Sequence, residues 1–118
     1  MRLAPQEAEY HYLLGLALNE TGDLPAATSA LQEAVRLDPK HASAWYNLGL
    51  AQHAGGSAEA ALQSLMRGES ANPTDPRIPY ARATILLQLD RRPEALDAAR
   101  RSLEIRPDFA SARQLLGI

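Results

Sequence analysis

A repeat with a period of 34 residues constrains the fold of this chain more than any other feature of the sequence. The prolines keep this step, at Pro5, Pro39, Pro73 and Pro107. Three further columns keep the same register: Tyr12, Tyr46 and Tyr80; Gly15, Gly49 and Ala83; Ala27, Ala61 and Ala95. A fixed period of 20–50 residues is typical of solenoids, in which every repeat packs against its neighbours.

Each period contains two helical segments joined by a short turn. From residue 7 to residue 19, apolar side chains recur at helical spacing. These apolar residues are Tyr10, Leu13, Leu14, Ala17 and Leu18. Gly22 then suits a left-handed helix end, and Asp23 suits the N-cap of a second helix. That helix is predicted to end before Pro39, because proline disfavours helix at the residue before it. The pattern returns at residues 41–53 and 58–71, and again at 76–89 and 93–105.

The small residues at the period's fixed columns predict close packing between the two helices of a hairpin. We expect Gly15, Gly49 and Ala83 to face the column of Ala27, Ala61 and Ala95. Only small side chains let two helices approach so closely, and leucine at these places would overpack the contact by about 1–3 kcal/mol.

Composition excludes several classes of site. The chain has no cysteine, so it has neither a disulfide framework nor a thiolate metal site. It has no run of about 18 apolar residues, as a membrane helix requires, so no membrane contact is expected. The net charge of −2 gives no support to nucleic-acid binding. The charge is nevertheless uneven: residues 1–75 hold nine acids and four bases, and residues 76–118 hold five acids and eight bases.

The repeated residues resemble the tetratricopeptide repeat. The family pattern is Trp-x2-Leu-Gly-x2-Tyr, then Ala-x3-Phe, then Pro. The middle repeat matches it best, with Trp45, Leu48, Gly49, Ala61, Leu65 and Pro73. The first repeat has His11 in place of the tryptophan, and the third is degenerate, with Pro79 and Arg82 in place of tryptophan and leucine.

The resemblance implies an all-α fold, a right-handed α-solenoid of antiparallel helix-turn-helix units with about seven helices. It divides the chain into the tail of a preceding repeat (1–7), three repeats (8–41, 42–75 and 76–109) and the start of a fourth repeat or capping helix (110–118). Both ends therefore look like cut repeats, as expected for a fragment of a longer array.

The resemblance also implies a binding site. First helices of successive repeats line a concave groove in this family, and the groove would bind a protein or peptide ligand. The matching positions here are Tyr12, Leu16, Asn19, Tyr46, Asn47, Leu50, His53, Arg77, Tyr80, Thr84 and Leu87. The tyrosines would form a ladder of peptide anchors, or they would support neighbouring helices, since a rigid aromatic residue can do both.

A chaperone-tail clamp of the kind found in some family members is not expected. Tyr12 and Leu16 stand where the clamp has its first lysine and asparagine, and Ala81 replaces one of its bases. Only Asn47 and Arg77 match the clamp pattern.

No catalytic, metal or cofactor site is predicted. The three histidines, His11, His41 and His53, have no metal-binding spacing. No nucleophile motif or phosphate loop occurs. The primary interpretation is therefore a non-catalytic protein-interaction scaffold. Two alternatives stay open: a homo-oligomer built by end-to-end stacking of oppositely charged ends, and a regulatory or substrate-recruiting segment of a larger enzyme.

Arg82 and the arginine pairs of the third repeat fall outside the repeat pattern. Arg82 occupies the column that holds Leu14 and Leu48. Because a buried unpaired charge is costly, we expect Arg82 to reach solvent or to pair with an acid. The alternative is that Arg82 recognises a charge on a ligand. The pairs at 91–92 and 100–101 are expected on a solvated surface.

Overall fold

The computed structural model of the chain describes residues 4–118, and it contains seven α-helices within that range. The helices are α1 (Ala4–Glu20), α2 (Leu24–Leu37), α3 (Ala42–Ala54), α4 (Ala58–Ala71), α5 (Arg77–Gln88), α6 (Arg92–Ile105) and α7 (Ala110–Leu116). No strand occurs in the described part of the chain. No helix among the described residues is long and apolar enough to cross a membrane.

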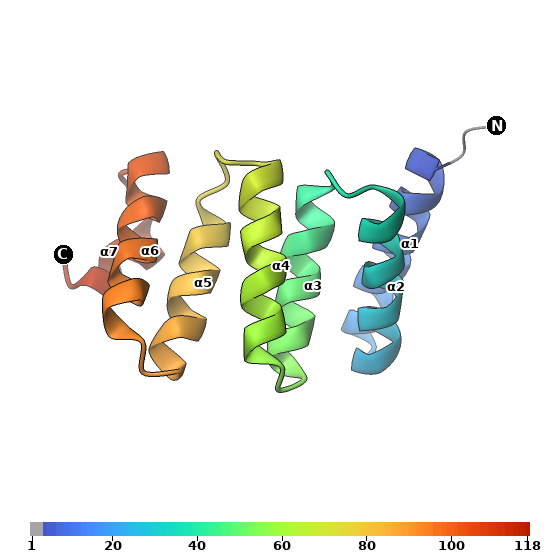
Figure 1. Cartoon of the computed structure of the whole chain (residues 1–118), viewed down its shortest axis with the longest axis horizontal. Helices are drawn as coiled ribbons and strands as arrows, with labels where there is room; N and C mark the ends of the chain where they lie inside the picture. The colour runs from blue at the N-terminus through green and yellow to red at the C-terminus, as the bar shows by residue number, and fades with distance from the viewer. Residues whose placement is uncertain (1–3) are drawn as a thin grey trace.

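The helices form three antiparallel hairpins stacked in chain order, with α7 packed on α6 (Figure 1). The described chain runs from α1 at one end of the stack to α7 at the other, and the molecule measures 49 × 27 × 20 Å. Each second helix also packs on the first helix of the next hairpin, so contacts connect neighbouring repeats only. The predicted all-α solenoid is therefore confirmed.

The turn within each hairpin uses a left-handed residue at the same column. Gly22 and Gly56 have φ of +87° and +91°, as the sequence predicted for Gly22. The third hairpin has Asp90 there, with φ +60°. In the first hairpin the next residue caps the following helix: an Asp23 carboxyl oxygen accepts a hydrogen bond from the Ala26 amide at 3.3 Å.

The glycines of α1 and α3 pack against leucines, which corrects the predicted contact in part. A Cβ placed on Gly15 would lie 2.7 Å from Cγ of Leu31, and one on Gly49 would lie 2.9 Å from Cγ of Leu65. The alanine predicted as the partner contributes its backbone oxygen, which would be 3.2 Å from the added Cβ at Gly49. The first helix therefore has glycine in this column because a leucine, one turn further along the second helix than the alanine, fills the space.

The third hairpin has two residues of equal size in these columns. Ala83 carries a Cβ where Gly49 has none, and Ala99 replaces Leu65. Both alanines are fully buried. The two columns therefore vary together: glycine stands opposite leucine in two hairpins, and alanine stands opposite alanine in the third.

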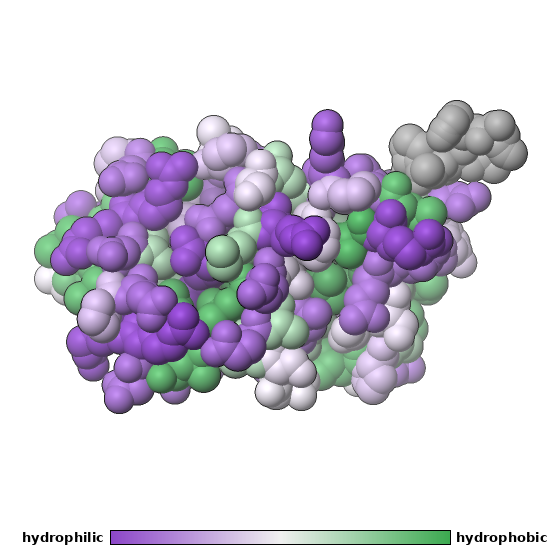
Figure 2. Space-filling view, in the orientation of Figure 1, coloured by the Kyte–Doolittle hydropathy of each residue, from purple (hydrophilic) through white to green (hydrophobic). Residues whose placement is uncertain are grey.

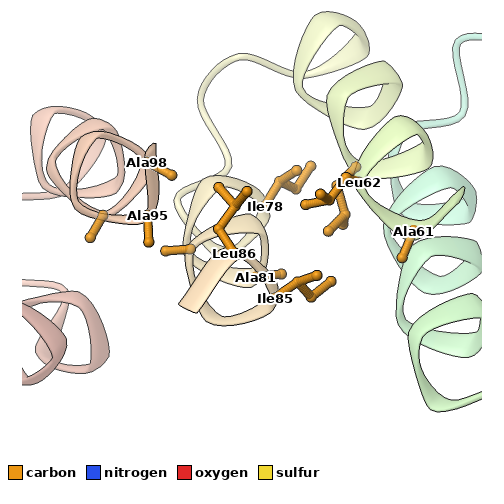
Figure 3. Packing of buried hydrophobic residues seen from close by; sticks show 11 residues of the cluster. Ala61, Leu62, Ile78, Ala81, Ile85, Leu86, Ala95 and Ala98 are labelled. Carbon is orange, nitrogen blue, oxygen red and sulfur yellow. The ribbon is translucent and has the colours of Figure 1, made fainter. Parts of the chain in front are cut away.

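The core forms two clusters, one at each seam between hairpins. The first joins α2 to α3 through Leu31, Ala34, Val35, Ala44, Leu48 and Ala51. The second joins α4, α5 and α6, where Ile78, Ile85 and Leu86 of α5 lie between Leu62 and Ala98 (Figure 3). The three first helices thus lie in equivalent places, and α3 and α5 each bury one side against the preceding second helix.

The equivalent side of α1 is exposed, although its apolar residues follow the same helical spacing. Tyr10 is 62 % exposed and Leu13 is 53 % exposed, and Leu14 and Ala17 are also exposed. Leu48 and Ala51, one period later, are buried because α2 covers them. The described chain has no second helix before α1 to do the same. Helix α1 begins at Ala4, three residues before the predicted start, and residues 1–3 lie outside the described range.

Candidate functional site

Nine of the predicted site residues form a regular array on the three first helices. The array contains Tyr12, Leu16 and Asn19 on α1, Tyr46, Leu50 and His53 on α3, and Tyr80, Thr84 and Leu87 on α5. Within each helix the spacing of four and then three residues places the side chains on one stripe. We call the surface formed by these stripes, together with Asn47 and Arg77, the first-helix face.

A small cleft on the first-helix face brings four of the predicted residues together. It has a volume of about 120 Å³ and lies between α1 and α3. Its lining residues are Leu16, Asn19, Leu31, Asn47, Leu50, Ala51 and Ala54. Leucine and alanine side chains therefore form an apolar pocket, and two amides supply hydrogen-bonding groups beside it.

Asn47 is held in a defined orientation by its own helix. Its Nδ2 donates a hydrogen bond to the backbone oxygen of Ser43 at 2.9 Å. The amide oxygen forms no hydrogen bond within the described chain and can accept one from the backbone N–H of a ligand.

The three tyrosines each pack against the beginning of the next first helix. The ring centroids of Tyr12 and His41 lie 4.5 Å apart, and those of Tyr80 and Phe109 lie 5.7 Å apart in a T-shaped arrangement. Tyr46 instead lies beneath the guanidinium of Arg77, 4.6 Å from its ring centre. All three are half-buried, so the tyrosine ladder supports the neighbouring repeats in the way that the sequence allowed.

Arg77 is fixed over Tyr46 by a carboxylate. Its Nη2 lies 2.7 Å from an oxygen of Asp75, and its Nε donates to the same group. This hydrogen bond lowers the pKa of the Asp75 carboxyl and raises the pKa of the guanidinium. Burial raises the pKa of the Tyr46 hydroxyl, although the nearby cation opposes it. The pair therefore stays ionised at neutral pH, with the guanidinium half-exposed at this face.

The remaining predicted residues lie on the same stripes but outside the cleft. His53 is half-buried. The hydroxyl of Thr84 donates to the backbone oxygen of Ala81 at 2.8 Å, and Leu87 packs against the second core cluster. The structure thus places Leu16, Asn19, Asn47 and Leu50 in one pocket and distributes the others along the face.

Sequence reasoning missed the role of His41, which connects two repeats. Its Nδ1 accepts the Ala44 amide at 3.1 Å and so caps α3, while Nε2 lies 3.0 Å from a carboxylate oxygen of Glu9. Its column, shared with Asp75 and Phe109, was the available signal. No group of three or more potential metal ligands occurs among residues 4–118.

Arg82 forms an ion pair, which was one of the three options that the sequence left open. Its Nε donates to a carboxylate oxygen of Glu69 on α4 at 2.6 Å, and Nη2 donates to the other at 3.3 Å. The pair is partly shielded, with side chains 22 % and 20 % exposed. It stands on the opposite side of the stack from the tyrosine stripes, beside a larger cavity between α4, α5 and α6.

Comparisons with known families identify the repeat. Residues 15–56 match a family model described as TPR repeat, and residues 42–75 match one described as Tetratricopeptide repeat. The two matches together span residues 15–75, which is more than half of the 118 residues. No curated protein sequence matches this chain.

Solved structures share the fold along almost the whole chain. The protein MamA is 26 % identical with a TM-score of 0.89, and the match covers 96 % of this chain and 66 % of MamA. This chain therefore spans just under two thirds of that protein.

Two similar structures contain bound peptides. The first TPR of Spaghetti (RPAP3) bound to the HSP90 peptide SRMEEVD is 18 % identical, with a TM-score of 0.90 over 96 % of this chain and 90 % of that one. The Yersinia enterocolitica type III secretion chaperone SycD, in complex with a peptide of the translocator YopD, is 24 % identical, with a TM-score of 0.83 over 92 % and 83 %. At these identities the likeness concerns the fold.

Proposed function

The chain belongs to the tetratricopeptide-repeat family, and on that premise we propose that it is a non-catalytic scaffold that binds a peptide or protein segment on its first-helix face. The cleft between α1 and α3 is the observation that carries this proposal, because it combines an apolar pocket with two amides. The peptide complexes of Spaghetti and SycD support it, since proteins of the same fold bind peptides.

The chemistry of the cleft favours an extended segment with an aliphatic anchor. A pocket of about 120 Å³ accommodates one side chain, and its walls of Leu16, Leu50 and Ala51 are apolar. Asn19 and Asn47 at the same cleft would hydrogen-bond the backbone on either side of that anchor. Tyr46 and Arg77 continue the face towards the third repeat, where the cation would contact a polar or acidic part of the ligand.

Selection from a displayed random-peptide library supplies a probe for this face. We expect selected peptides to bind the intact chain and to lose about 2 kcal/mol of binding free energy, roughly thirty-fold in Kd, when Leu50 is replaced by Ala. The Asn47→Ala variant should lose less, because it removes one hydrogen bond. Fluorescence anisotropy with a labelled peptide measures both changes, and circular dichroism checks that helicity is unchanged.

Tyr46→Ala and Tyr10→Ala form a matched pair of tyrosine variants. Both replace a tyrosine on a first helix, but Tyr10 faces away from the cleft on the uncovered side of α1. We expect Tyr46→Ala alone to weaken peptide binding. If every selected peptide bound the Leu50→Ala and Tyr46→Ala variants as tightly as the parent chain, the proposal would be wrong.

Self-assembly is a second candidate function, favoured by the apolar residues at the two ends of the stack. Tyr10 and Leu13 are exposed on α1, and Ile118 is exposed beyond α7. The end bearing α1 is also the acidic part of the sequence, and the end bearing α7 is the basic part. Light scattering over a range of protein and salt concentrations tests this idea: head-to-tail association should weaken with salt, and a monomer under all conditions would exclude it.

A further inference from the structure

The second-helix side of the molecule contains a groove that the proposed peptide-binding face does not use. The groove has a volume of about 500 Å³, with α4 and α6 as its walls and Arg82 and Leu86 of α5 at its base. A second cavity of about 380 Å³ shares Met66, Glu69, Arg82 and Arg101 with it and extends it to Pro73. Together they follow α4 from Glu59 to its last residue, Ala71, which is about 18 Å at the helical rise per residue, and they reach Pro73 just beyond it.

The residues that line this groove depart from the repeat far more than the core does. Seven of the twelve residues lining the larger cavity are charged. At the twelve positions one period earlier, between the first and second repeats, only Arg67 is charged. Val35 and Leu48 of that seam are replaced by the ion pair of Glu69 and Arg82. Departures from a local pattern that gather at one surface are expected where a surface has a function.

Arg91 is a further departure from the repeat, and it connects the two walls of the groove. Its column holds Asp23 in the first hairpin, where the side chain caps the following helix. An arginine cannot accept that hydrogen bond, and α6 has no side-chain cap, as is also the case for α4 after Ser57. The guanidinium instead bridges Glu94 at 2.9 Å and Glu59 of α4 at 3.1 Å.

The groove has charged side chains at both ends and an apolar middle. At the end near the helix N-termini, Glu59 and Glu94 pair with Arg91, and Asp97 is a third acid of the lining. Asp97 lies 3.2 Å from Arg100 outside the lining, so acids exceed bases by one when that pair is counted. At the other end Arg82 pairs with Glu69, and Arg101, which is 47 % exposed, lies 3.3 Å from Glu104 outside the lining. Between these ends Met66 is 53 % exposed, and methionine is common at surfaces that bind apolar helix faces. The viewed face of the molecule shows this change of character, with hydrophilic surface over α6 next to a hydrophobic patch towards α4 (Figure 2).

We propose that this groove is a second binding site, separate from the first-helix face, for an amphipathic peptide helix of about four turns. The helix has basic side chains at one end, apolar side chains in the middle and acidic side chains at the other end. Its bases lie near Glu94 and Asp97, its apolar stripe contacts Met66, and its acids reach Arg101. The groove's length matches a helix of about 14 residues, and the occupant is selected by its order of charges.

A pair of synthetic helical peptides of 14 residues tests the proposal. The matched peptide carries lysines at one end, a leucine stripe in the middle and glutamates at the other end. The mixed peptide has the same composition, with lysines and glutamates interspersed at both ends. We expect the matched peptide to bind at least ten times more tightly in NMR titrations, and to shift the methyl signals of Met66 and Leu86.

Two variants locate the binding. Met66→Gln introduces the residue found one period earlier at Gln32, and Arg101→Glu reverses an exposed charge. Each should weaken the matched peptide about tenfold, whereas Leu50→Ala should leave its Kd unchanged. Equal binding of the two peptides, shifts confined to the first-helix face, or no binding would each overturn the proposal. Leu50 lies on the first-helix face and not in this groove. The Leu50→Ala variant therefore tests the proposed peptide-binding function separately from the groove.

Discussion

The second and third repeats have the same hairpin but differ in what they expose. Helices α3 and α4 follow the repeat pattern closely, and α5 and α6 keep the same places in the stack with many changed residues. In the interior the changes compensate one another in size. On the second-helix side they replace apolar and uncharged residues with charge. The comparison separates two kinds of departure: one preserves packing, and the other creates a new surface.

A second pair of columns shows the compensation in size. In the second repeat Trp45 stands opposite Gly68, and a Cβ on that glycine would lie 3.3 Å from Cβ of the tryptophan. In the third repeat Pro79 replaces the tryptophan, and Ser102 takes the place of the glycine. The serine is fully buried and its hydroxyl donates to the backbone oxygen of Pro76 at 2.7 Å. A smaller first-helix residue thus admits a larger partner.

The largest expected effect is the loss of a core leucine that only the regular hairpins possess. Leu65→Ala removes a fully buried side chain, so we expect the free energy of unfolding to fall by about 3 kcal/mol. Ala99→Gly at the same column of the third repeat should cost only about 1 kcal/mol, because it removes one methyl group from a helix. Urea denaturation measures both values. A similar loss in the two variants would contradict the difference in packing.

A double-mutant cycle tests whether the two columns vary together for a physical reason. Gly49→Ala should cost about 1–3 kcal/mol, since the added Cβ would lie 2.9 Å from Cγ of Leu65. In the Leu65→Ala background the same change should cost little, because the pair then matches Ala83 and Ala99. Simple additivity of the two costs would show that the columns are independent.

The ion pair of the third repeat gives a smaller effect. Arg82→Leu leaves Glu69 in a partly shielded place without its partner, so we expect a loss of about 1–2 kcal/mol. Adding Glu69→Val restores the residues of the first seam, and the double variant should be at least as stable as the parent chain. Thermal unfolding of the single and double variants measures these changes. A double variant less stable than the parent chain would show that the ion pair stabilises the fold.

The smallest expected effect concerns the turn. Asp90 has a positive φ where the other hairpins have glycine, so Asp90→Gly should raise stability by about 0.5 kcal/mol. The reciprocal change in the second repeat, Gly56→Asp, should lower it by about 1 kcal/mol. A shift of the melting temperature in the same direction for both would contradict the account of the turn.

The fold was predictable because its period appears directly in the sequence. The columns of proline, tyrosine and small residues specified helix number and order. The exposure of Tyr10 and Leu14 was not predictable from the same pattern, since these residues match buried ones in the next repeat. Helical spacing identifies the apolar side of a helix, but it does not say whether another helix covers that side.

The candidate sites were predictable to different degrees. The resemblance placed Leu16 and Asn47 on one face, and the structure joins them in a cleft. That Tyr46 would lie beneath Arg77 was not visible, because the contact crosses from one repeat to the next. The sequence identified Arg82 as a residue outside the repeat pattern, but it did not predict the groove beside it. The charge of the groove depends also on Glu69 and Arg91, which the stacking of the helices brings to the same lining.

The central claim is that the charged departures of the third repeat serve its surface and not its fold. The most direct test is the free energy of unfolding of one variant in which the groove takes the residues of the first seam: Met66→Gln, Glu69→Val, Arg82→Leu, Arg91→Ser and Glu94→Ala. Urea denaturation should show a variant at least as stable as the parent chain, because the ion pair of Glu69 and Arg82 becomes an apolar contact. A loss of more than about 2 kcal/mol would show that these residues hold the repeat together, and would contradict the account.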